Sequence, residues 1–293
     1  MQKCWFITGA SRGLGANIAR AALAAGDRVV ATGRDPEAVR AALGAEHERL
    51  AILPLDVAHA AQAEAAVGGA LARFGGIDVL VNNAGFGQVG FFEESSEDDM
   101  RAQFDSNLFG MMHVTRAVLP GMRAARAGRI INLSSLAGLH GAMFSTLYSA
   151  SKFAVEGFSE ALAEEMATFG IRVTIVAPGP FRTDFLTSRS LRVGALTLPD
   201  YDAMRQKILA GFAARDGRQT GDPVKLAQAI VALANDPAPP LRFVAGTPAL
   251  DAALQSLARK QEEIASRRAQ SVDTDGDYAD VQEWELPASS VKG

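Results

Sequence analysis

A tyrosine and a lysine four residues apart, Tyr148 and Lys152 in the run YSASK, carry the side chains best suited to acid–base chemistry. Residues at positions i and i+4 of a helix lie on the same face, so the ammonium group can approach the phenol. A free tyrosine has a pKa of about 10, and a nearby positive charge lowers that value by stabilising the phenolate. The pair predicts a group that exchanges a proton with a substrate oxygen, although the same spacing is common on solvated helix faces.

Polar residues also follow two apolar runs that are typical of buried strands. Ser134 and Ser135 end the run RIINLSS, and the residues NNAG at 82–85 end the run DVLVNNAG. The carboxyl ends of parallel strands share one edge of a sheet, and open α/β sheets bind their ligands at that edge. A serine hydroxyl at this edge can donate a hydrogen bond to a substrate carbonyl.

The segment TGASRGLG at residues 8–15 predicts a phosphate-binding loop. Gly9, Gly13 and Gly15 allow a tight turn, let the backbone approach a pyrophosphate and let the helix pack closely on the strand. The free N–H groups of the following helix would then bind the phosphates. The alternative is an ordinary strand-to-helix turn, but the loop lies between a predicted strand and a predicted helix, as a dinucleotide site requires.

Two arginines favour NADP(H) over NAD(H) as the cofactor. The second predicted strand is followed by Gly33, Arg34 and Asp35, and Arg12 lies in the glycine-rich loop. An acidic residue directly after this strand would bind the ribose 2′-hydroxyl, whereas an arginine binds a 2′-phosphate with two hydrogen bonds. Alternatively, Arg34 is an ordinary surface residue, and Asp35 caps the next helix in either case.

Short β-branched runs alternate with longer alanine-rich helical segments along most of the chain. This alternation predicts an α/β fold, with a doubly wound, mainly parallel seven-stranded Rossmann-type sheet and helices on both faces. We expect one catalytic domain over residues 1–270, in which the weakly periodic segment 185–221 covers the substrate. We expect strands at residues 3–8, 28–32, 50–55, 78–82, 129–133, 171–177 and 241–245, and helices at 14–25, 60–74, 98–125, 149–169 and 248–268, the last packed on the sheet edge.

Composition excludes several other classes of protein. The 293 residues include 29 Lys and Arg against 33 Asp and Glu, so the chain lacks the basic character of a nucleic-acid-binding protein. It contains one cysteine, Cys4, and no apolar run long enough to cross a bilayer, so we expect a cytoplasmic protein without disulfides. The histidines show no metal-ligand spacing. Residues 271–293 form an acidic tail whose DTDGD run lacks the glycine and glutamate positions of a calcium loop.

These motifs together closely resemble the short-chain dehydrogenase/reductase family over roughly residues 3–250, and the middle of the chain is similar to the 17β-hydroxysteroid dehydrogenase branch. The resemblance implies that Asp56 contacts the adenine and that the PGPFRT segment at 178–183 contacts the nicotinamide end. The cofactor-binding residues implied by the motifs and this resemblance are Gly9, Ser11, Arg12, Gly13, Leu14, Gly15, Arg34, Asp56, Val57, Asn83, Ala84, Gly85, Tyr148, Lys152, Pro178, Gly179, Phe181 and Thr183.

The resemblance also implies four catalytic residues, which are Asn107, Ser135, Tyr148 and Lys152. Ser135 matches better than Ser134, because the family's serine lies thirteen residues before its tyrosine. In the implied mechanism, Ser135 holds a carbonyl oxygen and Tyr148 donates the proton. Lys152 would hold the ribose hydroxyls and lower the pKa of the tyrosine, and Asn107 would position a water molecule.

We therefore expect an NADPH-dependent carbonyl reductase (ketoreductase) that acts on a bulky apolar ketone or aldehyde. The alternatives are an alcohol or hydroxysteroid dehydrogenase working oxidatively with NAD(P)+, and a non-catalytic NADP(H)-binding regulatory protein. Members of the family are often dimers or tetramers, so we expect a homodimer or homotetramer. Apolar residues close to the catalytic motifs in sequence are candidates for the substrate pocket: Phe86, Phe91, Phe92, Leu136, His140, Met143, Phe144, Phe185 and Leu186, with Phe181 at the nicotinamide end.

Overall fold

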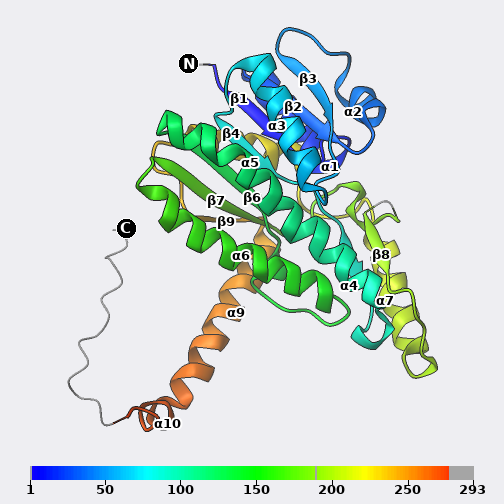
Figure 1. The fold of residues 1–293 in the computed structure, drawn as a ribbon. Coiled ribbons are helices and arrows are strands. Elements are labelled where there is room, and N and C mark those ends of the chain that lie inside the picture. Colours follow the sequence, from blue (N-terminus) through cyan, green and yellow to red (C-terminus); the bar gives the residue numbers. More distant parts are fainter. Residues whose placement is uncertain (1, 189, 277–293) are drawn as a thin grey trace.

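The centre of the molecule is a seven-stranded sheet in which every neighbouring pair of strands is parallel (Figure 1). The computed structural model describes residues 2–188 and 190–276 of the chain. The strand order is β3-β2-β1-β4-β6-β7-β9, so the winding reverses between β1 and β4. The strands are β1 Cys4–Ile7, β2 Arg28–Gly33, β3 Leu50–Pro54, β4 Val79–Asn82, β6 Gly128–Leu133, β7 Ile171–Pro178 and β9 Arg242–Ala245.

Helices cover both faces of this sheet, which explains why the strands read as continuous apolar runs. In β1, Trp5 and Ile7 belong to the hydrophobic core beneath α1 and α8, whereas Cys4 and Phe6 belong to the core beneath α3, α5 and α6. The predicted doubly wound Rossmann-type fold is therefore confirmed. The helices around the sheet are α1 Gly13–Ala24, α2 Pro36–Leu43, α3 Ala60–Phe74, α5 Gly110–Ala125, α6 Thr146–Ala167 and α8 Pro223–Asn235.

The helix expected at residues 98–125 is interrupted near its middle. It consists of α4, Glu97–Phe104, then one π-helical turn at Asp105–Phe109, and then α5. The start of α4 is fixed by a capping box, in which the Ser96 and Asp99 side chains each accept from the other's backbone N–H. A single π turn inside an α-helix is uncommon and frequently marks a functional residue.

The segment expected to cover the substrate, residues 185–221, contains an unexpected strand. Strand β8, Leu191–Val193, pairs in parallel with β5, Gly87–Val89, and the two form a separate small sheet. Each strand is only three residues long, too short for a recognisable hydrophobic period, so the sequence carries no signal for this pairing. The other elements of this segment are the short helices η4 Asp184–Leu186 and η5 Pro199–Tyr201 and the helix α7 Asp202–Arg215. Two further short helices, η1 Phe92–Glu94 and η3 Leu136–Gly138, lie earlier in the chain.

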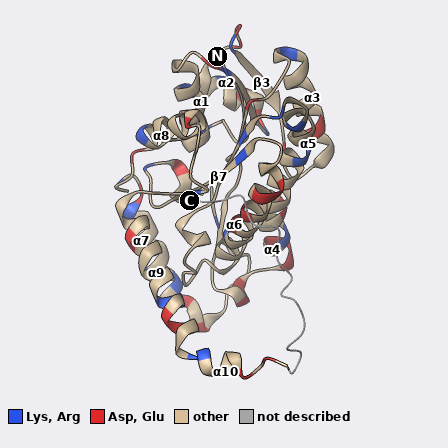
Figure 2. Cartoon of the chain, turned by 90° about the vertical axis from the view of Figure 1, so that its left-hand side faces the viewer, with Lys and Arg blue, Asp and Glu red and all other residues tan. Residues whose placement is uncertain are grey.

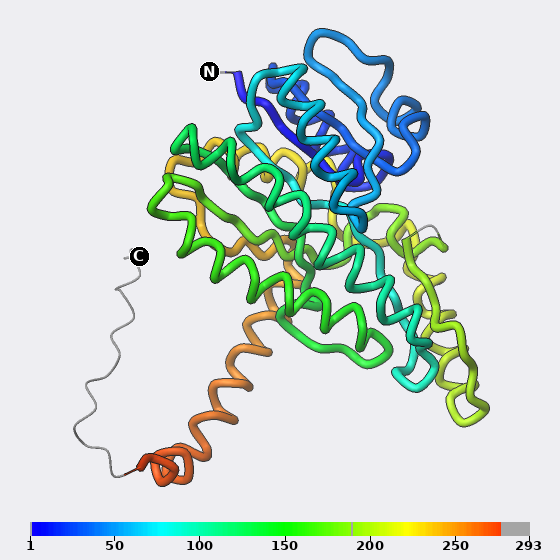
Figure 3. Tube along the Cα trace, in the orientation of Figure 1, coloured from blue at the N-terminus to red at the C-terminus, as the bar shows by residue number. Residues whose placement is uncertain are grey.

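The last long helix, α9 at Thr247–Ser266, packs on the body only along its first half. Ala249, Ala253 and Ser256 are buried, whereas the residues from 257 onward are mostly exposed, and the helix projects away from the sheet (Figures 1 and 3). Figure 2 shows acidic and basic residues interspersed along this projecting part. The expected packing on the sheet edge therefore holds for the first half only. A short helix, α10 at Arg268–Val272, follows, and most of the predicted acidic tail, from residue 277 onward, lies outside the described residues.

Candidate active site

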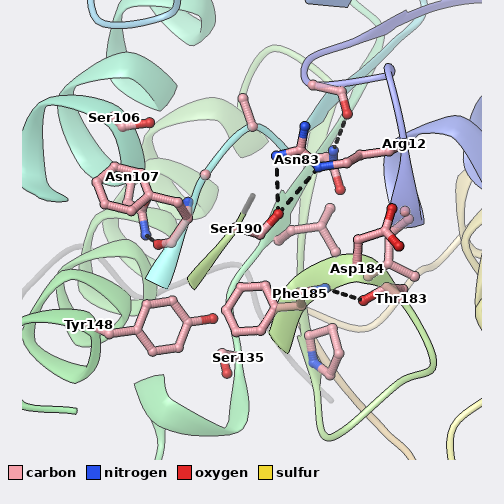
Figure 4. A pocket seen from close by; sticks show the side chains of 18 of the residues that line it. Arg12, Asn83, Ser106, Asn107, Ser135, Tyr148, Thr183, Asp184, Phe185 and Ser190 are labelled. Atoms are coloured by element: carbon pink, nitrogen blue, oxygen red, sulfur yellow. Dashed lines mark hydrogen bonds between the residues drawn. The ribbon is translucent and has the colours of Figure 1, made fainter. Parts of the chain in front are cut away.

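A cavity of about 520 Å³ lies at the carboxyl ends of the central strands. It is lined by the glycine-rich loop after β1, the NNAG turn after β4, the serines after β6 and the Pro-Gly turn after β7. Because the sheet winding reverses between β1 and β4, the loops that follow these strands diverge and leave a crevice between them. Figure 4 shows residues from the glycine-rich loop, the π turn, α6 and the 183–190 segment around this cavity.

The glycine-rich loop is fastened directly to the NNAG turn. The Thr8 hydroxyl accepts hydrogen bonds from the backbone N–H groups of Asn83 and Ala84, both at 3.0 Å. In return, the Asn83 amide donates to the carbonyl oxygens of Thr8 at 2.9 Å and Gly9 at 3.0 Å. A Cβ atom at Gly15 would lie only 2.3 Å from the Gly9 carbonyl oxygen, so a side chain at this position would separate the helix from the loop.

The two arginines expected to select the cofactor differ in their surroundings. Arg34 is exposed at the cavity, and no hydrogen bond or ion pair with another described residue holds its guanidinium group. Arg12 also lines the cavity, and its guanidinium donates to the Ser190 hydroxyl at 3.1 Å (Figure 4). Asp35 accepts from the Glu37 backbone N–H at 3.0 Å and caps α2, as the sequence predicted.

The Tyr148 phenol lies beside the Ser135 side chain, and both line the cavity (Figure 4). Burial of the phenol raises the pKa of Tyr148 to about 12, and the neighbouring Ser135 side chain offsets only part of this effect. The sequence predicted a lowered pKa, but in this structure the loss of hydration outweighs the attraction of neighbouring groups. Tyr148 therefore carries its proton at neutral pH.

Lys152 lies one helical turn beyond Tyr148 on α6 and is almost completely buried. Its Nζ atom donates to the Leu133 carbonyl oxygen at 2.7 Å and lies 5.8 Å from the centre of the Tyr148 ring. Burial lowers the pKa of Lys152 to about 8, against the opposing influence of the Glu156 carboxylate. The ammonium group therefore loses its proton only a little above neutral pH.

Asn107 lies within the π turn between α4 and α5, and its side-chain amide forms two hydrogen bonds with the backbone of Phe86. Its amide nitrogen donates to the Phe86 carbonyl at 2.9 Å, and its amide oxygen accepts from the Phe86 N–H at 3.0 Å. A Cβ atom at Gly85 would lie 2.9 Å from this amide oxygen, so the glycine makes room for the contact. The π turn thus ties the NNAG turn to the helix layer beside Tyr148.

The neighbouring side chains of Ser134 and Ser135 have different surroundings in the structure. Ser135 accepts from the Ala137 N–H at 3.1 Å and contacts Tyr148. The Ser134 hydroxyl is buried and has no hydrogen-bond partner among the described residues, although it lines the cavity as well. The geometry therefore favours Ser135 as the partner of the phenol.

The cavity brings together the four expected catalytic residues and every expected cofactor-binding residue except Gly15, which is buried behind the loop. Of the expected substrate-pocket residues, Phe86, Phe185 and Leu186 line it, and Phe181 lines it at the Pro-Gly turn. The others lie outside this lining, and several contact one another instead. Phe144 is buried against Phe91, which stacks on Tyr201; Met143 is exposed, and Phe92, Leu136 and His140 are not part of the cavity wall.

Several lining residues were not identified from the sequence. Most of them are sequence neighbours of predicted motif residues, so including the residues on either side of each motif would have identified them. Arg192 and Gln219 are different, because the segment that carries them shows no motif or periodicity; the Arg192 guanidinium lies 4.2 Å from the centre of the Phe86 ring. The unpredicted lining residues are Gly33, Leu55, Ala58, Ala102, Asp105, Ser106, Leu133, Asp184, Ser190, Arg192 and Gln219.

Within residues 2–188 and 190–276, no group of three or more histidine, cysteine or carboxylate side chains is arranged to hold a metal ion. Over the same residues, no helix combines the length and the apolar character that crossing a bilayer requires.

Comparisons with known proteins place the chain among oxidoreductases. The family described as short chain dehydrogenase matches residues 3–193. Oxidoreductase BOA17 of Botryotinia fuckeliana is 40% identical over 252 residues, which cover 86% of this chain and 91% of that protein. The 3-ketodihydrosphingosine reductase of Bacteroides thetaiotaomicron is 38% identical over 240 residues, covering 82% of this chain and 86% of that protein.

Solved structures agree with the sequence comparisons. A short-chain dehydrogenase from Streptomyces avermitilis superposes with a TM-score of 0.86 at 38% identity, covering 94% of this chain and 100% of that chain. ElxO with NADP bound has a TM-score of 0.67 at 28% identity, covering 80% of this chain and 92% of its own. A short-chain dehydrogenase/reductase from Burkholderia phymatum in complex with NAD has a TM-score of 0.75 at 26% identity. The match covers 90% of this chain and 95% of that chain.

Proposed function

The chain belongs to the short-chain dehydrogenase family of oxidoreductases, and we propose that it is an NADPH-dependent reductase of ketones or aldehydes. The observation that carries this proposal is the placement of Ser135 beside protonated Tyr148 in a cavity that is also lined by the glycine-rich loop. One end of the cavity is suited to phosphates, and the other presents a proton donor to a carbonyl oxygen.

The residues present fit a nicotinamide dinucleotide. The close contact of Gly15 with the Gly9 carbonyl brings the start of α1 up to the loop, where its N–H groups would hold the pyrophosphate. Asp56 and Val57 would border the adenine, and residues 178–183 would border the nicotinamide. When bound, the reduced nicotinamide supplies the hydride for the reaction.

The protein's own part in the reduction is to hold the carbonyl and supply the proton. Ser135 would donate a hydrogen bond to the carbonyl oxygen and Tyr148 would transfer its phenolic proton to that oxygen as the hydride reaches the carbonyl carbon. This leaves an alcohol product and a phenolate on Tyr148. The ammonium group of Lys152 would stabilise that phenolate, which is why the charged form of the lysine matters. Because its pKa is raised, Tyr148 would start a reductive cycle with its proton in place.

The preference for NADPH rests on Arg34. Its guanidinium is exposed beside the cavity and has no competing partner among the described residues, so it is available to a 2′-phosphate. Related structures hold either NADP or NAD, so the choice depends on the residues of this chain.

Side-by-side consumption of NADPH and NADH with aromatic, aliphatic and steroidal ketones tests the proposal. We expect turnover with NADPH exceeding that with NADH. Binding of NADPH, seen as a change in its fluorescence, without turnover of any ketone or aldehyde would contradict the reductase and favour a non-catalytic binding protein.

A homodimer or homotetramer and a cytoplasmic location are further parts of the proposal. Phe109 at the end of the π turn and Phe153 on α6 expose large apolar rings on the two helical segments that carry Asn107 and Tyr148. Such exposed rings support an interface on this side of the molecule. Light scattering after gel filtration would measure the assembly, and cell fractionation the location.

A further inference from the structure

A second cavity, of about 340 Å³, adjoins the first on the side of the covering segment. Pro180, Leu186 and Gln219 line both cavities and form the partition between them. Beyond this partition the walls consist of Phe212 and Arg215 of α7, Arg218 and Thr220 after that helix, and Pro248 at the start of α9. The surface that faces this cavity is almost entirely apolar, so the two arginines contribute mainly their alkyl stems, and the walls can accept an alkyl group.

Phe185 connects the partition with the candidate catalytic residues. Its ring lies 5.6 Å from the ring of Tyr148, centre to centre, and lines the first cavity (Figure 4). The next residue, Leu186, belongs to the partition. A ligand whose carbonyl group reaches Tyr148 can therefore continue past Phe185 and Leu186 towards the second cavity.

Gln219 places an unsatisfied amide at this partition. Its side chain is only 6% exposed, and neither the amide nitrogen nor the amide oxygen has a hydrogen-bond partner within the described part of the chain. Buried amides are almost always paired, because burying an unpaired donor or acceptor is unfavourable. An amide of this kind that faces a cavity is available to both a donor and an acceptor of a ligand.

We infer that the two cavities together bind an elongated substrate with three parts: a ketone at Tyr148, a group at Gln219 that both donates and accepts hydrogen bonds, and an alkyl chain in the second cavity. This inference rests on the proposed reductase function for the position of the ketone. It specifies the substrate class as an alkyl-chain ketone that carries an amide or hydroxyl group between the reacting carbonyl and the chain.

The test uses N-octyl ketoamides with one to three methylene groups between the ketone and the amide. Their N-methyl counterparts lack the chain, and 2-tridecanone has the chain without the amide. In the wild-type protein with NADPH, we expect kcat/KM of the best N-octyl ketoamide to exceed that of its N-methyl counterpart by at least about tenfold. Equal values for the two compounds would contradict a role for the second cavity.

Two substitutions test the separate parts of the site. Gln219→Leu removes both hydrogen bonds and should lower kcat/KM for the N-octyl ketoamide roughly tenfold while changing that for 2-tridecanone less than about twofold. Its Tm should equal or exceed that of the wild type, because an unpaired buried amide is replaced by an apolar side chain. Thr220→Trp places bulk in the second cavity from an exposed position and should abolish the N-octyl advantage while leaving the N-methyl ketoamide unchanged.

Calorimetric titration with the alcohol that corresponds to the N-octyl ketoamide measures binding without turnover. It should bind the wild-type chain at least about fivefold more tightly than either variant. If the alcohol binds the wild-type chain more tightly than both variants but no ketone is reduced, the proposed reaction is wrong and the elongated binding site stands. If Gln219→Leu lowered kcat/KM equally for all ketones and also weakened NADPH binding, Gln219 would belong to the cofactor site and the inference would be overturned.

Discussion

The sheet edge and the covering segment are held in place in different ways. At the edge, backbone groups of neighbouring strands and turns fix the functional residues, as in the reciprocal hydrogen bonds of Thr8 and Asn83 and the contact of Lys152 with Leu133. The covering segment combines the short backbone pairing of β8 with β5 and contacts to side chains that precede it in the chain. The Glu94 carboxylate accepts from the Leu198 N–H at 2.9 Å and pairs with Arg205, and Asp99 accepts from the Ala195 N–H at 3.0 Å.

This difference indicates how the two parts contribute to function. The sheet edge holds the proton donor and the dinucleotide loop in positions that strand pairing dictates, so small changes elsewhere leave them intact. The covering segment adds the three-residue strand β8, two short helices, the helix α7 and the second cavity, and it is held by the β5–β8 pairing and a few polar contacts. Segments held in this way tolerate sequence change, which suits a region that selects the substrate.

The largest effect should come from a change at the sheet edge itself. Tyr148→Phe removes the proton donor while keeping the ring against Phe185, so kcat should fall by about a thousandfold. The Kd of NADPH, measured by fluorescence titration, should change little because the glycine-rich loop is untouched. Near-normal turnover in this variant would exclude Tyr148 as the acid.

A change at the same edge but at the opposite end of the dinucleotide site should alter the choice of cofactor. Arg34→Asp replaces a phosphate-binding group with a carboxylate that repels phosphate and can bind a ribose hydroxyl. We expect kcat/KM for NADPH to fall about a hundredfold and that for NADH to rise. Steady-state kinetics with one ketone and both cofactors would measure this; an unchanged ratio would place the selection elsewhere, with Arg12 as the first residue to examine.

The pH dependence of reduction should show how the buried lysine at the sheet edge acts. The pKa of Lys152 is lowered to about 8, so the residue is charged at pH 7 and mostly neutral at pH 9. Tyr148, with its pKa raised to about 12, keeps its proton throughout this range. We expect kcat/KM to fall about tenfold from pH 7 to pH 9. If Lys152→Arg remains active, the fall should disappear, because arginine stays charged; a fall that persists would come from another group.

The smallest effect should come from loosening the covering segment. Glu94 is 1% exposed and pairs with Arg205, so Glu94→Gln should reduce the free energy of unfolding by about 2 kcal/mol. It should also raise the KM for the ketone about fivefold while leaving the Kd of NADPH unchanged. The control is Glu97→Gln, whose exposed pair with Arg101 should contribute under about 0.5 kcal/mol. Urea unfolding gives the free energy of unfolding of both variants, and steady-state kinetics gives the KM for the ketone. If Glu94→Gln and Glu97→Gln changed these two quantities equally, the buried pair would not hold the covering segment.

The sequence predicted the sheet edge well because its signals are local. The loop at residues 8–15, the turn at 82–85 and the Tyr148–Lys152 spacing each depend on a few adjacent residues with a known backbone geometry. The π turn around Asn107 was missed, because an α-helical pattern and one extra residue within it are hard to tell apart. In the covering segment, β8 was missed because its pairing with β5 joins residues about a hundred positions apart.

The order of residues by itself determines the set of parts: the fold class, the glycine-rich loop and the proton-donating pair. Their physical basis is short-range, since it lies in backbone conformation and in the periodicity of apolar side chains. Only the folded chain decides the raised pKa of Tyr148, the lowered pKa of Lys152 and the unpaired amide of Gln219 between two cavities. These properties depend on burial and on partners distant in the sequence, so they arise only when the strands, helices and covering segment pack together.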